Sequence, residues 1–211
     1  MFFKNKTVRA LIVAAGLGVA GLGSASAQVL ASLPVDTQPI ASVGDAKPLP
    51  AWTEFCQTYR DECSFDRNEP AQISLTPKMW QTIVSVNRKV NATIKPMLDS
   101  DHWGVADRWD LPKDGFGDCE DYQLLKRKML ADAGLPRRAM RMTVVIDEKN
   151  EGHAVLMIRT TQGDFALDNK TDEVLPWSET GYVFVKRESQ EAVAWVSLGR
   201  ATSPTATAKN R

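Results

Sequence analysis

The sequence predicts an α+β domain in which N-terminal helices pack on an antiparallel β-sheet formed by later residues. Two observations carry this prediction. Before Pro136, apolar residues recur at the three- and four-residue spacing of amphipathic helices. After Pro136, short, roughly alternating segments are separated by loops of hairpin length. Helices followed by a run of strands is the order expected of an α+β domain.

Residues 1–27 have the pattern of an export signal. Basic residues precede an apolar and glycine-rich run, and Ala25-Ser26-Ala27 offers the small side chains of a cleavage site. The alternative is a membrane anchor, but the run is short beside the roughly 20 apolar residues of a span. We expect a linker or loosely packed arm over 28–50, a folded domain over 51–199, and a flexible tail over 200–211.

Charge argues against nucleic acid as a partner. The chain has 26 basic and 26 acidic residues, and the predicted signal carries three of the basic residues and none of the acidic ones. The exported chain is therefore slightly acidic, whereas phosphate binding depends on clustered Lys and Arg. We expect no stable membrane span after signal cleavage.

The first long helix is predicted to begin at Thr76-Pro77, a hydroxyl N-cap followed by proline at the first helical position. Its buried face would comprise Met79, Ile83, Val86, Val90 and Ile94. We expect the helix to end near Pro96. Asn87 and Asn91 lie four residues apart, and we favour a solvated face over a polar seam against a neighbouring element.

A second helix is predicted over 119–133, after an aromatic and acidic loop over 101–112. Asp118 is the expected N-cap, and Gly134 is suited to the C-terminal end. Five strands should follow, over residues 140–146, 153–159, 165–168, 182–186 and 193–198.

The three cysteines divide unevenly. Cys56 and Cys63 are seven residues apart, and in an exported chain we favour a disulfide between them over two unpaired thiols. Their spacing fits no zinc site. Cys119 is left over, which suggests intermolecular pairing or a reactive thiol.

Cys119 has the sequence context of a nucleophile. It begins a helix, where unpaired N–H groups favour the thiolate. His153 opens one predicted strand and Asp168 closes the next, so a hairpin would bring a base and an orienting carboxylate together. His102, the other histidine, is the competing base, but it stands in the aromatic loop without an evident carboxylate partner. The structural alternative for Cys119 is a small buried apolar residue.

Acidic residues surround this cysteine: Asp114, Asp118, Glu120 and Asp121. Uncompensated negative charge raises the pKa of a thiol. Either these side chains point away or something neutralises them, and calcium, which prefers carboxylate oxygens, is suited to that role. The alternative is a set of solvated acids at a helix start.

The motifs resemble those of the bacterial transglutaminase-like cysteine peptidases. The similarity lies in Asp-His-Trp-Gly from Asp101, Gly-Asp-Cys-Glu-Asp-Tyr from Gly117, His153-Ala-Val-Leu, and Leu167-Asp168-Asn169. It extends from about Trp52 to Trp195. Gln123 and Ala154 depart from the family pattern, and neither change removes a catalytic group.

This resemblance implies a papain-like core with Cys119, His153 and Asp168 as the catalytic triad. It also implies calcium bound by Asp118, Glu120 and Asp121, and a site-lining or oxyanion-supporting role for Trp103. The best-known members are periplasmic proteases that release a large biofilm adhesin under the control of an inner-membrane receptor that senses cyclic-di-GMP. The resemblance therefore suggests a protein substrate, an adhesin among the candidates, and such a receptor as partner.

Two other functions are compatible with the same residues. A transglutaminase would use the triad to pass the acyl group to an amine instead of water, which a fluorescent amine and a glutamine peptide would reveal. A non-catalytic calcium-dependent binding module would leave Cys119 unreactive towards a thiol-directed activity probe.

Overall fold

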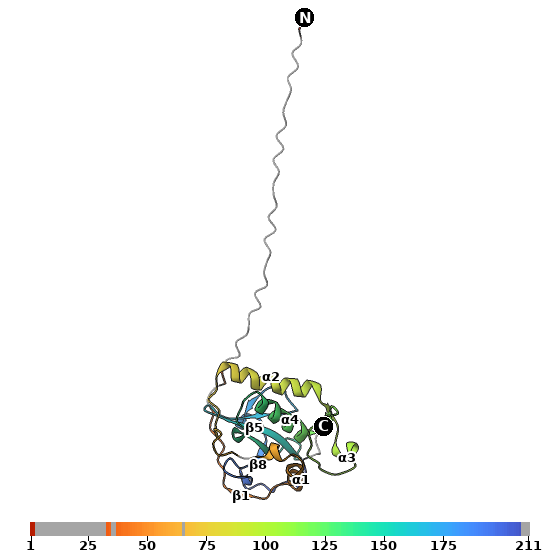
Figure 1. Cartoon of the computed structure of the whole chain (residues 1–211), viewed down its shortest axis with the longest axis vertical. Coiled ribbons are helices and arrows are strands. Elements are labelled where there is room, and N and C mark those ends of the chain that lie inside the picture. Colours follow the sequence, from red (N-terminus) through yellow and green to blue (C-terminus); the bar gives the residue numbers. More distant parts are fainter. Residues whose placement is uncertain (3–32, 35–36, 65, 208–211) are drawn as a thin grey trace. The chain divides into compact units, whose positions relative to one another are not determined.

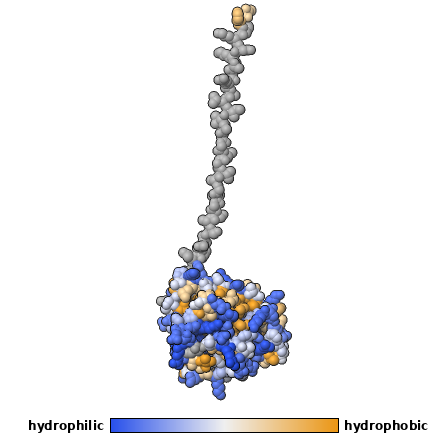
Figure 2. Space-filling model, viewed as in Figure 1, coloured by the Kyte–Doolittle hydropathy of each residue, from blue (hydrophilic) through white to orange (hydrophobic). Residues whose placement is uncertain are grey.

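The structure is a computed structural model that describes residues 1–2, 33–34, 37–64 and 66–207 of the 211. The predicted signal peptide over 1–27 lies outside the described residues apart from the first two. Among the helices described, none combines the length and apolar character needed to cross a membrane. Figure 2 shows a largely hydrophilic face of the domain with apolar residues scattered over it.

A seven-stranded antiparallel sheet forms the centre of the domain (Figure 1), in the order β1-β9-β8-β4-β5-β6-β7. Its strands are β1 (Gly44–Ala46), β4 (Met140–Ile146), β5 (Gly152–Thr160), β6 (Gly163–Leu167), β7 (Leu175–Pro176), β8 (Val183–Glu188) and β9 (Trp195–Ser197). All five predicted strands have a counterpart here, and the predicted α+β class is confirmed.

Helices cover one face of this sheet. The α-helices are α1 (Pro50–Thr58), α2 (Pro77–Thr93), α3 (Asp99–His102) and α4 (Cys119–Asp132). Three short 3-10 helices lie at Arg60–Cys63, Arg137–Ala139 and Trp177–Glu179, and Trp177 of the last packs on the opposite face. Helix α4 packs on β5, and α2 packs on α4 (Figure 1). Thr76 caps α2 as predicted, since its hydroxyl accepts a hydrogen bond of 3.2 Å from the Met79 amide. The predicted loop over 101–112 begins inside α3, which sequence periodicity did not reveal.

Strand β5 is buried on both faces. Leu156 and Ile158 belong to the core beneath the helices, whereas Val155 and Met157 belong to a second cluster on the opposite face. Successive side chains of a strand point to opposite faces, so a strand covered on both sides carries an unbroken apolar run. Central strands of this kind hold their neighbours in a fixed position.

The arm expected over 28–50 is in part a component of the sheet. Gly44–Ala46 form β1, which pairs with β9 at the edge. Ile40 is buried, and its amide donates to Asp164 Oδ2 at 3.0 Å. The expectation of a linker or loosely packed arm is corrected for these residues. An edge strand of three residues has too few positions to show alternation.

Asn87 and Asn91 form a polar seam, so the favoured solvated face was wrong. Asn87 Nδ2 donates to the carbonyl of Thr171 at 3.1 Å. Asn91 Nδ2 donates to the carbonyls of Asp168 and Thr171, at 3.0 and 2.9 Å. Helix α2 thereby holds the loop that begins at Asp168.

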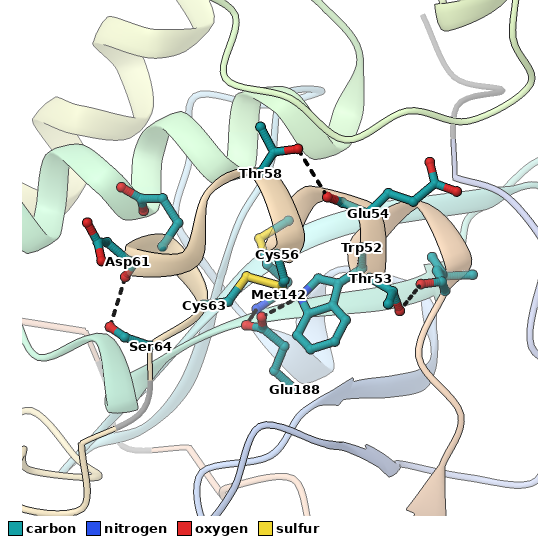
Figure 3. The surroundings of a disulfide bond; sticks show 12 residues. Trp52, Thr53, Glu54, Cys56, Thr58, Asp61, Cys63, Ser64, Met142 and Glu188 are labelled. Carbon is teal, nitrogen blue, oxygen red and sulfur yellow. Dashed lines mark hydrogen bonds between the residues drawn. A yellow bond between two sulfur atoms is a disulfide. The ribbon is translucent and has the colours of Figure 1, made fainter.

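A disulfide joins Cys56 to Cys63 and ties α1 to the adjoining 3-10 helix (Figure 3). The alternative of two unpaired thiols is therefore not what the structure contains. Beside it, Glu188 of β8 accepts hydrogen bonds from the Trp52 indole at 2.7 Å and the Met142 amide at 3.0 Å. These contacts bind α1 to the sheet.

The far end of α4 is also anchored in the interior. The Arg127 guanidinium lies 2.7 Å from the same Glu188 carboxylate, and both side chains are buried. Burial alone would raise the pKa of Glu188, but the positive charges of Arg127 and Arg141 lower it. Removing one partner of such a pair typically costs about 3–5 kcal/mol. The helix that begins with Cys119 is thus fixed at its C-terminal half.

Lys126 is fully buried in α4, and burial lowers its pKa from 10.5 to about 7. Between these values the unfolded chain binds more protons than the folded chain, so the free energy of unfolding should rise with pH over this range. We expect Lys126→Met to raise the free energy of unfolding at pH 7 by a few kcal/mol at most and to flatten this pH dependence. Urea unfolding between pH 6 and 10 measures both effects.

The matched control is Lys128→Met, two residues along the same helix. Lys128 has 39% of its side chain exposed and pairs with Asp132 at 2.9 Å. This change should alter the free energy of unfolding by less than about 1 kcal/mol. Equal behaviour of the two variants would contradict the cost assigned to the buried ammonium group.

Candidate active site

Cys119 is the first residue of α4, and Asp118 alone separates it from the strand β3 (Phe116–Gly117). Strand β3 pairs in parallel with β2 (Lys95–Pro96). The turn into the helix requires glycine, because a Cβ on Gly117 would lie 2.7 Å from Asp121 Oδ2. Asp118 occupies the N-cap position, as predicted, but its side chain makes no capping hydrogen bond. The Cys119 side chain is fully buried and is not in a disulfide.

His153 and Asp168 lie together, as the hairpin arrangement predicts. His153 Nε2 is 2.9 Å from Asp168 Oδ1, and both side chains are buried. Asp168 also accepts hydrogen bonds from the Tyr182 hydroxyl at 2.6 Å and the Lys170 amide at 3.1 Å. Burial alone would raise the pKa of Asp168, but these hydrogen bonds and the imidazole lower it to about 2. The carboxylate is therefore ionised and holds the ring by its Nε2 side.

The sulfur does not bond to the imidazole in this structure. The Cys119 thiol donates towards Glu120 Oε2 at 3.0 Å and towards the Thr207 carbonyl at 3.1 Å. Within the described residues, His153 Nδ1 is buried and has no hydrogen-bond partner. The backbone N–H of Ala154, next to His153 on β5, interacts with the sulfur. The thiol and the histidine thus belong to adjoining segments, with the thiol turned towards other acceptors.

Gln123 links the thiol-bearing helix to the strand end that carries Asp168. With its amide oriented to satisfy both groups, its nitrogen donates to the Leu167 carbonyl at 3.0 Å and its oxygen accepts from the Asn169 amide at 3.3 Å. Gln123 departs from the family pattern noted above, and the structure gives it a role in joining α4 to β6.

His102 does have a carboxylate partner, which corrects the expectation from sequence. Its Nε2 lies 2.8 Å from Asp114 Oδ2, and its ring stacks on Trp103 at 3.9 Å. Trp103 is 42% exposed and also carries the Arg108 guanidinium 4.2 Å above its ring. Asp114 is thus engaged with His102 and not with the thiol among the hydrogen bonds of the described residues. The site-lining role of Trp103 stays a prediction.

Three buried carboxylates form a cluster beside the thiol. Oxygens of Asp99, Asp118 and Glu120 lie within 4.8 Å of one another. Burial, with repulsion from neighbouring carboxylates, raises the pKa of Asp99 to about 6, that of Asp118 to about 7, and that of Glu120 well above its usual value. Asp118 Oδ1 and Glu120 Oε1 are buried without a hydrogen-bond partner among the described residues. Orphaned carboxylate oxygens at this spacing suit a hard cation such as calcium.

The cluster contains Asp99 in place of the predicted ligand Asp121. Asp121 Oδ1 accepts a hydrogen bond of 2.8 Å from the Asp110 amide and so holds the loop that follows Trp103. The metal role of Asp121 stays a prediction. Sequence reasoning missed Asp99, although its position two residues before Asp101 in an acidic stretch was an available signal.

The C-terminal segment also contacts the acidic residues beside the thiol. Thr207 is fully buried, and its amide and hydroxyl lie 3.2 and 3.1 Å from Asp107 Oδ1. Its hydroxyl is also 3.1 Å from Glu120 Oε2. The expectation of a flexible tail over 200–211 is corrected for residues up to Thr207. The residues beyond it lie outside the described chain.

The electrostatics of this arrangement favour a protonated thiol. Burial, followed by the negative charges of Glu120 and Asp118, raises the pKa of Cys119 well above its usual value. A thiolate would therefore require that the sulfur be exposed or paired with a proton acceptor, and that the carboxylates be neutralised.

Comparison with known proteins identifies the family of the chain. The family model described as bacterial transglutaminase-like cysteine proteinase BTLCP matches residues 43–203. The calcium-bound structure of Legionella pneumophila LapG is similar, with a TM-score of 0.50 and 25% identity over 60% of this chain and 74% of that one. No curated protein matched the sequence.

Two further LapG structures from Legionella pneumophila also align with the chain. One gives a TM-score of 0.48 and 24% identity over 57% of this chain and 69% of that one. The other, EGTA-treated, gives 0.49 and 25% over 58% and 68%. The family match spans most of the folded domain and includes the segments that carry Cys119, His153 and Asp168. The chain therefore belongs to the bacterial transglutaminase-like cysteine proteinases.

Proposed function

We propose that this cysteine proteinase is an exported endopeptidase that cleaves peptide bonds through Cys119, His153 and Asp168. The observation that carries the proposal is the buried His153–Asp168 pair, whose atoms lie 2.9 Å apart. His153 is on β5, the strand that packs against the thiol-bearing helix. A buried imidazole held by an ionised carboxylate has the arrangement of a general base.

The hydrogen bond to Asp168 selects the tautomer of His153. Because the Nε2–H group donates a hydrogen bond to the ionised carboxylate, Nδ1 is left as the proton acceptor. In the reaction, Nδ1 takes the proton of Cys119, and the thiolate attacks the carbonyl carbon of the substrate. The N–H of Cys119 and a neighbouring donor hold the oxyanion. His153 then protonates the leaving amine and activates the water that releases the acyl group.

We further propose that Asp99, Asp118 and Glu120 hold calcium. The structurally similar LapG is described in a calcium-bound form, and the three side chains here offer the oxygen ligands that calcium prefers. When bound, the ion supplies positive charge that offsets the carboxylates beside the thiol. Glu120 contacts both the sulfur and the cluster, so neutralising it removes a barrier to ionisation of Cys119.

The resemblance described for the sequence extends the proposal to location and partners. An export signal, together with a disulfide within the folded domain, is consistent with the oxidising periplasm. There we propose a large surface adhesin as the substrate and an inner-membrane receptor as the regulator. Neither partner is a nucleic acid.

The test is incubation of the mature protein with periplasmic and surface proteins of its own host, in calcium buffer, followed by N-terminal mapping of new fragments. The wild-type chain should generate discrete fragments, and Cys119→Ala should generate none while keeping its circular dichroism spectrum. Cleavage by the alanine variant would end the proposal. Incorporation of a fluorescent amine without hydrolysis would instead indicate a transglutaminase.

A further inference from the structure

The last described segment of the chain, Ala201–Thr207, ends in contact with the Cys119 thiol. The six residues before Thr207 in this segment are exposed or half-buried, whereas Thr207 is fully buried. Its carbonyl oxygen is 3.1 Å from the sulfur of Cys119. This carbonyl and the Glu120 carboxylate are the two hydrogen-bond acceptors towards which the thiol points.

The contact is anchored by more than one group. The Thr207 amide and hydroxyl both approach Asp107, and the hydroxyl also approaches Glu120. A hydroxyl has one proton to donate, so two carboxylates share it. Three polar atoms of Thr207 are thus engaged with residues that adjoin the thiol, which fixes the segment there.

The body of the domain is shaped to accept this segment. A Cβ on Gly152, the residue before His153, would collide with the Ala206 carbonyl oxygen and lie 2.8 Å from Pro204 Cβ. Only glycine leaves room for the tail backbone at this point. The tail therefore contacts the start of β5 through Gly152 and the start of α4 through Cys119, the two segments that carry the proposed base and nucleophile.

The Thr207 carbonyl is oriented to obstruct the thiol and not to be attacked by it as a substrate would be. A thiolate must reach the carbonyl carbon, whereas here the oxygen accepts a hydrogen bond from the S–H group. The buried His153 Nδ1, which would accept the thiol proton, has no partner among the described residues. With Thr207 in place, the proton is directed away from the base.

We propose that Ala201–Thr207 is an intramolecular plug that shields Cys119 in the free protein and must move before a peptide can bind. The inference rests on the proposed function, since it places the plug over the proposed nucleophile. The matched family region, 43–203, ends within this segment. Because the segment is covalently attached to the domain, its effective concentration at the thiol is high, and the few hydrogen bonds of Thr207 suffice to hold it there.

The experiment measures the rate at which iodoacetamide alkylates Cys119, in calcium buffer without reductant. Cys56 and Cys63 form a disulfide, so Cys119 is the only free thiol. Thr207→Trp keeps the full chain and its charge, but the indole does not fit the buried position of Thr207. Because reactivity scales with the fraction of open molecules, we expect alkylation at least about tenfold faster than in the wild type.

The matched control is Thr205→Trp, which makes the same substitution at an exposed position two residues earlier. It should react at the wild-type rate. A chain ending at Arg200, shown by circular dichroism to be folded, should match Thr207→Trp. A synthetic peptide of residues 201–211, added in excess, should slow its alkylation again.

Two results would overturn the plug. One is equal alkylation rates in the wild type, Thr207→Trp and the shortened chain. The other is loss of residues 208–211 from the wild type but not from Cys119→Ala, measured by intact mass, because it would make the tail a substrate. Faster alkylation of Thr207→Trp with no peptide cleavage by any variant would support the plug and remove only the proposed peptidase.

Discussion

His153→Ala is expected to lower kcat/KM for peptide cleavage by about four orders of magnitude or more. His153 is fully buried, and its Nε2 is bonded to Asp168 at 2.9 Å. Its removal takes away the acceptor for the thiol proton and the acid for the leaving amine in one change. The measurement is steady-state cleavage of a peptide derived from a fragment mapped with the natural substrate, with Cys119→Ala as the baseline.

The chain supplies its own control for this result, because it has two histidines. His102→Ala removes an imidazole that pairs with Asp114 and stacks on Trp103. It should retain kcat/KM to within about tenfold, since the lost contacts are near the protein surface. If His102→Ala proved the more damaging substitution, the assignment of His153 as the base would be wrong.

Removal of calcium is expected to abolish cleavage and to lower the melting temperature. At a free calcium concentration 100 times the dissociation constant, binding would stabilise the fold by about 2.7 kcal/mol. EGTA should eliminate this gain, and added calcium should restore both stability and activity. Asp118→Asn removes one carboxylate of the three-acid cluster, so it should weaken calcium binding, measured by titration calorimetry.

Asp132→Asn is the matched control for the calcium measurements. Asp132 ends the same helix, and its side chain is 60% exposed. This variant should bind calcium as the wild type does. Full activity in EGTA, with an unchanged melting temperature, would exclude the ion from both catalysis and stability.

The elements predicted best are those whose local signals agree with the tertiary structure. Thr76-Pro77 set the start of α2 because both the cap and the proline act within one turn. The strands from Met140 onward were recognisable from their apolar runs and hairpin spacing. His153 and Asp168 could be paired in advance because adjacent antiparallel strands bring such ends together.

What could not be predicted depends on partners that are distant along the chain. Asn91 looks solvated until the carbonyl of Asp168, 77 positions away, is brought against it. Lys126 and Arg127 look like cations at the end of a helix, and burial of α4 between α2 and the sheet places both in the interior. Asp99 joins the acidic cluster only because α3 folds back on Asp118. No local pattern encodes these contacts.

The burial of Thr207 also bears on how the protein is prepared for biochemistry. Only four residues would separate an affinity tag fused after Arg211 from the buried Thr207. The bulk and charge of the tag would act directly on the segment that meets the sulfur. Whether the affinity tag is placed at the N-terminus or the C-terminus is therefore expected to affect the reactivity of Cys119. Untagged protein is the proper reference for kinetic measurements.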